Sequence, residues 1–193
     1  MPPAPLSSGS RDGVTRYVAL LRAVNVGGKN SLPMGELRAA LREHYPDVAT
    51  LLQSGNVLLT SGRSASATAS DISRTIEDAF SLRVTVVVRS AAEMESIVQR
   101  NPFVEAGVAP NPALLHVAFL EQHPTPEAIH SLDATRSPPD AFVVSGCEVY
   151  LAYPNGSART RLTLDYLEKR LGVAGTARNW RTVRRLADLL IST

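Results

Sequence analysis

Two short polar segments carry the groups with which this chain could bind an anion. The first holds two adjacent glycines and a lysine, Gly27, Gly28 and Lys29, and it follows an apolar segment that ends near Arg22. Glycines let a backbone approach a ligand closely and direct N–H groups toward it, and the N-terminus of a following helix adds a partial positive charge. Residues 25–30 are therefore a candidate site for phosphate or carboxylate, although their glycine spacing does not match the P-loop.

The second polar segment is a tight glycine-containing turn between two expected strands, residues 48–53 and 57–60. The order of the expected elements places this turn at the same edge of the sheet as residues 25–30, so we expect the two segments to lie side by side. The charge partners expected for a ligand are Arg22 and Lys29, the hydrogen-bonding groups are Asn25, Gln53, Ser54 and Asn56, and backbone access comes from Gly27 and Gly28.

A third segment, residues 176–180, contains the single tryptophan of the chain and allows two interpretations. In the structural one, Asn179 caps a helix, Trp180 anchors the core and Arg178 forms an ion pair. In the functional one, Arg178 and Trp180 lie over a ligand as a guanidinium fork and a stacking face. The functional interpretation requires a rotation between the two halves of the chain that the sequence does not specify, so both stay open.

Acid–base and metal chemistry have no evident agent in these segments. They contain no Asp, Glu, His or Cys, and the four histidines of the chain lack the spacing of metal ligands. Cys147 follows an expected hairpin turn with no base nearby in sequence. The sequence therefore predicts no metal site, assigns no catalytic residue or cofactor, and does not decide whether the protein is an enzyme.

An internal repeat separates the scaffold from its additions. Residues 16–22 resemble residues 115–121 at an offset of 99. Residues 53–60 resemble residues 145–152, with Ser54-Gly55 matching Ser145-Gly146 at an offset of 91. The offsets differ by eight, which indicates about eight extra residues in the first copy, at or near residues 25–30.

The elements that position these segments follow the same order in both copies. Apolar runs and helical periodicity predict strand, helix, strand, strand, helix, strand, the order of a ferredoxin-like plait, and then one more helix. The expected fold is α+β, with two tandem ferredoxin-like subdomains. The expected organisation is a disordered tail at 1–15, a first subdomain with a linking helix at 16–100, a linker at 101–113 and a second subdomain with a C-terminal helix at 114–193.

Composition limits the cellular setting and the classes of partner. A net charge of +2 is too small to indicate a polyanion partner, and the single cysteine, Cys147, favours a reducing compartment. The first 15 residues lack the apolar core of a signal peptide, and the apolar run at 84–88 is too short to span a bilayer. We expect a cytoplasmic protein that has no membrane segment.

Four motifs in sequence resemble the bacterial domain of unknown function 1697 family. They occupy residues 21–30, 53–57, 101–103 and 176–183. The resemblance spans about residues 16–190 and implies a pair of plait subdomains in one chain, but it implies no activity. Ala23 stands where glycine is usual in the family, and Leu52 stands where isoleucine is common.

Three functions follow as hypotheses. The leading one is binding of a small anionic or nucleotide-like ligand at the Gly27–Gly28 loop. The alternative is a protein–protein interaction module that uses its sheets or the face formed by Arg181, Arg184 and Arg185, with a partner that the sequence does not identify. Binding of RNA or single-stranded DNA is a less favoured second alternative, because strand 57–60 has no aromatic residue for base stacking and only Tyr150 and Tyr153 offer one in the second copy.

Overall fold

The computed structural model of the chain describes residues 13–25, 31–106 and 111–192. Most of the tail predicted at 1–15, and the central part of the predicted linker, lie outside the described residues. The first strand already begins at Thr15, inside the predicted tail.

The elements alternate in the predicted order. The first half contains β1 (Thr15–Leu21), α1 (Met34–Leu41), β2 (Ala49–Leu51), β3 (Asn56–Ser61), α2 (Ala65–Phe80), β4 (Val86–Ser90), α3 (Ala91–Gln99) and α4 (Pro102–Glu105). The second half contains η2 (Pro112–Leu114), β5 (Leu115–Leu120), α5 (Pro126–His130), β6 (Ala141–Ser145), β7 (Glu148–Ala152), η3 (Ser157–Arg159), α6 (Leu164–Leu171), β8 (Gly175–Asn179) and α7 (Trp180–Ile191).

Each half forms one four-stranded antiparallel sheet, in the order β2-β3-β1-β4 and β6-β7-β5-β8. The α+β class is therefore confirmed. The register makes the halves directly comparable, because Leu20 of β1 pairs with Asn56 and Phe119 of β5 pairs with Glu148. Likewise Val18 pairs with Arg89 and Val117 with Arg178. Asn56 thus corresponds to Glu148, and Arg89 corresponds to Arg178.

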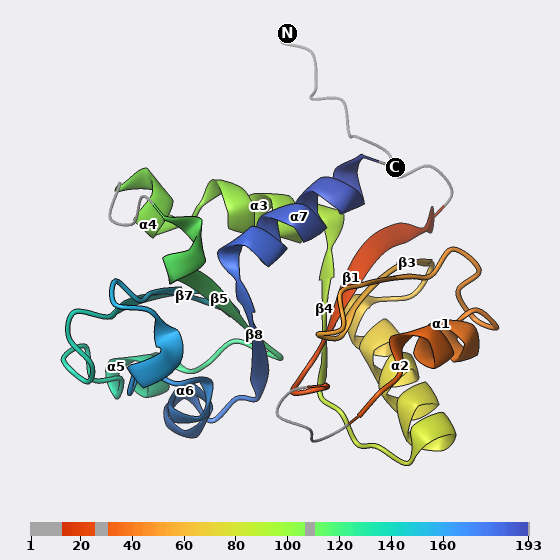
Figure 1. Ribbon diagram of the computed structural model, residues 1–193, viewed down its shortest axis with the longest axis horizontal. Coiled ribbons are helices and arrows are strands. Elements are labelled where there is room, and N and C mark those ends of the chain that lie inside the picture. Colours follow the sequence, from red (N-terminus) through yellow and green to blue (C-terminus); the bar gives the residue numbers. More distant parts are fainter. Residues whose placement is uncertain (1–12, 26–30, 107–110, 193) are drawn as a thin grey trace, which may run out of the picture.

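Three apolar clusters hold these layers together (Figure 1). One lies between the first sheet and helices α1 and α2, and another between the second sheet and helices α5 and α6. The third cluster is shared, because it combines residues of both sheets with the inner faces of α3 and α7. These two helices lie side by side across the top of the molecule in Figure 1. The shared cluster therefore fixes one half against the other.

The register corrects the predicted size of the insertion. Asn56 follows Leu20 by 36 positions and Glu148 follows Phe119 by 29, so the first copy is longer by seven residues rather than eight. Two of the seven lie in the hairpin loop itself, which has four residues between β2 and β3 and two between β6 and β7. The sequence match of Ser54-Gly55 to Ser145-Gly146 is therefore displaced by one position.

The polar stretch at 61–67, rich in serine, alanine and glycine, favours a loop on composition alone, but this interpretation is partly wrong because α2 begins at Ala65. The Oγ of Ser64 accepts a hydrogen bond from the Ala67 N–H at 3.2 Å, and Thr68 is fully buried one turn later. A serine cap and a run rich in alanine start the helix before its apolar stripe begins. Within the described parts of the chain, we find no helix with the length and apolar character required to cross a membrane.

Candidate functional site

Asn25 joins the two polar segments that we expected to lie side by side. Its Nδ2 donates to the carbonyl oxygens of Gln53 and Leu32, both at 2.8 Å, and its Oδ1 accepts from the Leu32 N–H at 2.8 Å. The end of β1 therefore lies against the β2–β3 hairpin, as the order of the elements indicated. Gly27, Gly28 and Lys29, which lie between these anchors in sequence, are outside the described residues.

The backbone at this edge takes conformations that most residues avoid. Four non-glycine residues have positive φ among those described, and three of them, Ala23, Asn25 and Leu52, are at this edge. Gly55 also has a φ of +71°, and a Cβ placed there would lie 2.4 Å from Cγ2 of Val24. Glycine adopts a positive φ without the steric cost that the Cβ of Ala23 brings there. Strain of this kind is concentrated at functional sites.

Arg178 reaches this edge from the second half of the molecule. Its five N–H groups make five hydrogen bonds: Nε to Asn56 Oδ1 (2.7 Å), Nη1 to Thr176 Oγ1 (2.6 Å) and the Ala177 oxygen (2.8 Å), and Nη2 to the oxygens of Leu21 (2.8 Å) and Gly55 (3.2 Å). Its side chain therefore has no N–H left for a ligand. Arg178 is a bridge between the halves, and the structure brings it together with Ser54 and Asn56, since Asn56 Nδ2 donates to Ser54 Oγ at 3.1 Å.

Arg89 makes the reciprocal bridge from the first half to the second. It donates through Nε to Glu148 Oε1 (2.8 Å), through Nη1 to the Val88 oxygen (3.0 Å), and through Nη2 to the oxygens of Leu120 (2.7 Å) and Cys147 (3.4 Å). The two contacts are thus reciprocal, because each arginine reaches from its own half to the end of the first strand and to the hairpin of the other half. Sequence reasoning missed Arg89, although in both halves an arginine stands directly before the cap of the helix that follows the last strand, Ser90 in one and Asn179 in the other.

The two bridges differ in charge. Glu148 gives Arg89 a carboxylate partner, whereas Asn56 at the corresponding position gives Arg178 a neutral amide. Among the described residues, no carboxylate pairs with Arg178. Burial lowers the pKa of Arg178 to about 10, because the surrounding protein solvates its charge less well than water does. Within the described residues, this edge therefore contains a buried cation without a counter-ion.

The other predicted site residues serve structural roles in the described chain. Arg22 donates to both carboxylate oxygens of Glu168, from Nε at 2.9 Å and from Nη2 at 2.6 Å. This ion pair is a further contact between the halves, in addition to the bridges of Arg178 and Arg89. Asn179 caps α7 by accepting from the Arg181 N–H at 3.0 Å, and Trp180 is buried in the shared cluster. The described contacts of Asn179 and Trp180 match the structural interpretation of residues 176–180.

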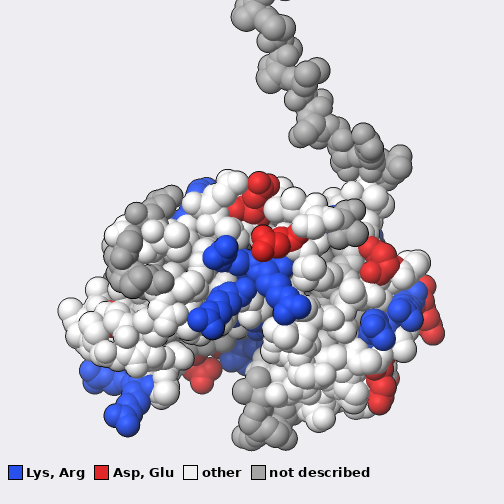
Figure 2. Space-filling view, turned by 45° about the horizontal axis from the view of Figure 1, so that its top comes forward, with Lys and Arg blue, Asp and Glu red and all other residues white. Residues whose placement is uncertain are grey.

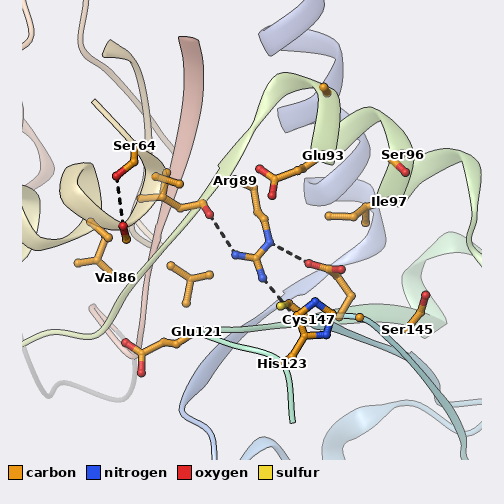
Figure 3. A pocket seen from close by; sticks show the side chains of 18 of the residues that line it. Ser64, Val86, Arg89, Glu93, Ser96, Ile97, Glu121, His123, Ser145 and Cys147 are labelled. Carbon is orange, nitrogen blue, oxygen red and sulfur yellow. Dashed lines mark hydrogen bonds and ion pairs between the residues drawn. The ribbon is translucent and has the colours of Figure 1, made fainter. Parts of the chain in front are cut away.

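A groove of about 1010 Å³ lies on the opposite contact between the halves (Figure 3). Figure 3 shows Arg89 between the α3 residues Glu93 and Ile97 on one side and Cys147 and His123 of the second half on the other. The charges of Arg89 and Glu148 in the groove compensate each other. The groove thus offers hydrogen-bonding groups but no uncompensated buried charge that would select an anion.

Cys147 is not an activated nucleophile in this groove. Its partial burial raises the pKa of its thiol, an effect that the nearby Arg89 only partly opposes, so the thiol is protonated at neutral pH and reacts slowly. The described residues also contain no group of three or more His, Cys, Asp or Glu side chains that could hold a metal ion.

His116 is expected to make the stability of the protein depend on pH. It lies on β5, its ring is 5.2 Å from that of Tyr153, and its buried Nδ1 has no hydrogen-bond partner among the described residues. Burial lowers the pKa of His116 below 6.5, so the unfolded chain binds a proton at a higher pH than the folded one. The contribution of His116 to stability is therefore fully present above pH 6.5 and is lost as the pH falls from 6.5 toward the folded-state pKa.

Urea unfolding at a series of pH values between about 5 and 7.5 tests this expectation. Replacing His116 with Gln should flatten the dependence of the unfolding free energy on pH in that range. The exposed His44 provides the control, because His44→Gln should leave the dependence as it is in the wild-type protein. Equal slopes in the wild-type and His116→Gln proteins would show that His116 is not the titrating group.

Comparisons with known proteins agree with this fold. The model of a family described as "Protein of unknown function (DUF1697)" matches residues 14–150. A solved structure, that of the conserved bacterial protein SP0830 from Streptococcus pneumoniae, is similar with a TM-score of 0.69 and 21% sequence identity, over 92% of this chain and 99% of that one. No curated protein matches the chain. At this identity, the likeness to SP0830 shows the fold alone.

Proposed function

We propose, for a chain that belongs to the DUF1697 family of proteins of unknown function, that it binds a small anionic or nucleotide-like ligand at the edge formed by residues 21–25 and 52–56. The observation that carries the proposal is that none of the carboxylates in the described part of the chain pairs with Arg178. The second half supplies its bridging arginine with Glu148, and the first half supplies only Asn56.

A buried charge that is solvated only by neutral groups favours an anion placed nearby. At an effective dielectric constant of about 20, a unit charge roughly 7 Å away interacts by about 2 kcal/mol. The ligand does not need an N–H group of Arg178 for this attraction. Its direct contacts are proposed to come from Lys29, from the backbone at Gly27 and Gly28, and from the amide of Gln53, whose carbonyl already joins the hairpin to Asn25.

Binding of phosphate, citrate, AMP and ATP, measured by isothermal titration calorimetry and by thermal shift, tests the proposal. At least one of these anions is expected to bind the wild-type protein and to raise its melting temperature. Lys29→Ala should weaken that binding. Asn56→Asp should weaken it at least about tenfold, because the new carboxylate supplies the charge that the ligand otherwise brings.

The readout for each variant is its melting temperature with ligand minus that without ligand. This difference removes any cost that the new carboxylate brings by facing the Leu51 carbonyl, to which Asn56 Nδ2 now donates at 3.0 Å. Asn155→Asp adds the same charge at an exposed turn of the second half and should leave ligand binding intact. An anion panel without any binding, or equal binding by the Asn56→Asp protein, would refute the proposal.

The finer architecture and setting belong to the same proposal. The strand orders and the antiparallel pairing support two tandem ferredoxin-like plaits at 16–100 and 114–193, each with one added helix. The single cysteine supports a reducing cytoplasmic setting.

A further inference from the structure

Helix α7 carries an exposed row of arginines in its first two turns. Arg181, Arg184 and Arg185 point away from the shared core, while Val183 and Leu186 on the opposite face are buried in it. Figure 2 shows basic side chains gathered at the centre of the face that carries α3 and α7, with a few acidic side chains beside them. The row therefore stands on a helix that is fixed against both halves.

These arginines have little to bind within the described part of the chain. Arg181 Nη2 makes one long contact, 3.5 Å, with Asn111 Oδ1. For Arg184 and Arg185 there is no side-chain hydrogen bond or ion pair to any described residue. Their positive charge is thus available at the surface.

The first arginine of the row is unfavourable for the helix itself. The N-terminal end of a helix carries a partial positive charge, so Arg181 in the first turn costs about 0.3–1 kcal/mol at low salt, whereas this effect has largely fallen off at Arg184 and Arg185 in the second turn. Helix α3 starts at the corresponding point of the first half, and its first turn carries the negative charge that this end of a helix prefers. Its first turn contains Glu93, which accepts a hydrogen bond from the Ser90 N–H at 2.7 Å, and no basic residue.

Comparing the two copies isolates the difference. Because Ser90 and Asn179 cap the two helices, Ala92, Glu95 and Ser96 of α3 correspond to Arg181, Arg184 and Arg185 of α7. The scaffold therefore does not require arginine at these positions. Residues that oppose the charge preference of their helix and make no stabilising contact are expected at a functional surface.

We propose that the arginine row of α7 is a docking surface for an acidic segment of a partner protein. The row covers only two helical turns, and the exposed Asp188 and Glu95 lie on the same helix pair. These carboxylates would repel a phosphodiester backbone, whereas a protein segment of mixed charge can place its own basic group against them. The small net charge of +2 also favours a local protein contact over a nucleic-acid surface.

Fluorescence anisotropy with a labelled peptide rich in Glu and Asp tests the proposal, with a single-stranded oligonucleotide of equal charge as the second probe. The peptide should bind the wild-type protein at low salt and bind the double variant Arg184→Glu/Arg185→Glu at least about tenfold more weakly. The matched control is Arg38→Glu/Arg42→Glu, which replaces one exposed arginine of α1 and the exposed arginine that directly follows this helix, and it should bind like the wild type. Added salt should weaken the peptide complex, since the charges are exposed.

Protein stability separates docking from a structural role. The double variant on α7 should melt close to the wild-type temperature, because both side chains are exposed and make no hydrogen bond or ion pair with a described residue, and the repulsion that the new glutamates add against Asp188 one turn later is small. Weaker binding by a protein that is fully folded at the assay temperature cannot result from unfolding. The proposal is overturned if the peptide does not bind, if both double variants lose binding equally, or if the oligonucleotide binds more tightly than the peptide.

Discussion

Replacing Arg178 with methionine is expected to lower the free energy of unfolding by about 2–4 kcal/mol. The substitution leaves Asn56 Oδ1 and the carbonyl oxygens of Leu21 and Gly55 without the donor that now joins them. Asn56 Oδ1 loses its only described donor, at a cost of about 1–3 kcal/mol. The oxygens of Gly55 and Leu21 each lose one of two donors, because Gly55 keeps the Leu21 N–H at 2.8 Å and Leu21 keeps Thr176 Oγ1 at 3.4 Å. Water that enters the space recovers part of the loss. Removal of the buried charge, whose pKa burial lowers to about 10, offsets another part.

Arg178→Lys should cause an intermediate loss. An ammonium group keeps the charge but carries only three N–H donors, all on one nitrogen. It cannot replace the five hydrogen bonds that Arg178 now donates from its three guanidinium nitrogens. Chemical denaturation of the three proteins provides the measurement. Arg181→Met, an exposed substitution three residues away, is the control and should not lower the unfolding free energy, because it removes only a positive charge at the N-terminal end of α7.

Amide hydrogen exchange shows which part of the protein is loosened by the loss of Arg178. The amides of Gly55 and of the first residues of β3 should exchange faster in the Arg178→Met protein, because this edge would no longer be tied to the second half. A loss of stability no larger than that of Arg181→Met, with exchange at the hairpin unchanged, would mean that the shared apolar cluster alone holds the halves together.

The sequence was sufficient for the order of elements and for the edge at which the polar segments meet. Continuous apolar strands and helical periodicity indicate the order of helices and strands along the chain. That order determines which loops lie at the same edge of the sheet. The contact between Asn25 and Gln53 confirms the adjacency. Local patterns succeed here because strand pairing within each half depends on the alternation and turns of that half alone.

The beginning of α2 shows where periodicity fails. Residues 65–70 are alanine, serine and threonine, which present no apolar stripe, so a polar loop was the natural interpretation. Alanine nonetheless has the highest helix propensity, and Ser64 supplies a cap. The helix thus begins before its buried face does.

The reciprocal contacts of Arg89 and Arg178 could not be predicted from the sequence of either half alone. It depends on how two complete sheets are placed around the shared cluster, and that placement is set by many weak contacts between residues far apart in sequence. The repeat nevertheless contained a signal, because Arg89 and Arg178 occupy the same position before a helix cap. The difference between Asn56 and Glu148 acquires its meaning only once the bridges are known.

The second large effect is expected at Glu148. Replacing it with leucine should lower the free energy of unfolding by about 3–5 kcal/mol, because the guanidinium of Arg89 would then be buried without its carboxylate. The two side chains are 9% and 14% exposed, so water can only partly replace the lost partner. Urea denaturation of the wild-type and Glu148→Leu proteins measures the loss.

Glu148→Gln should cost less than Glu148→Leu, because Arg178 already shows that an amide oxygen can accept from a bridging Nε, at 2.7 Å from Asn56. The exposed pair Arg83–Glu77 is the control, with side chains 88% and 47% exposed, and Glu77→Gln should cost less than about 1 kcal/mol. If Gln and Leu at position 148 cost the same, the geometry of the acceptor does not matter and the comparison between the two bridges fails. If Gln costs less, as expected, an amide is sufficient to hold a bridging arginine, and the uncompensated charge at Arg178 is then compatible with a stable fold that leaves its counter-ion to a ligand.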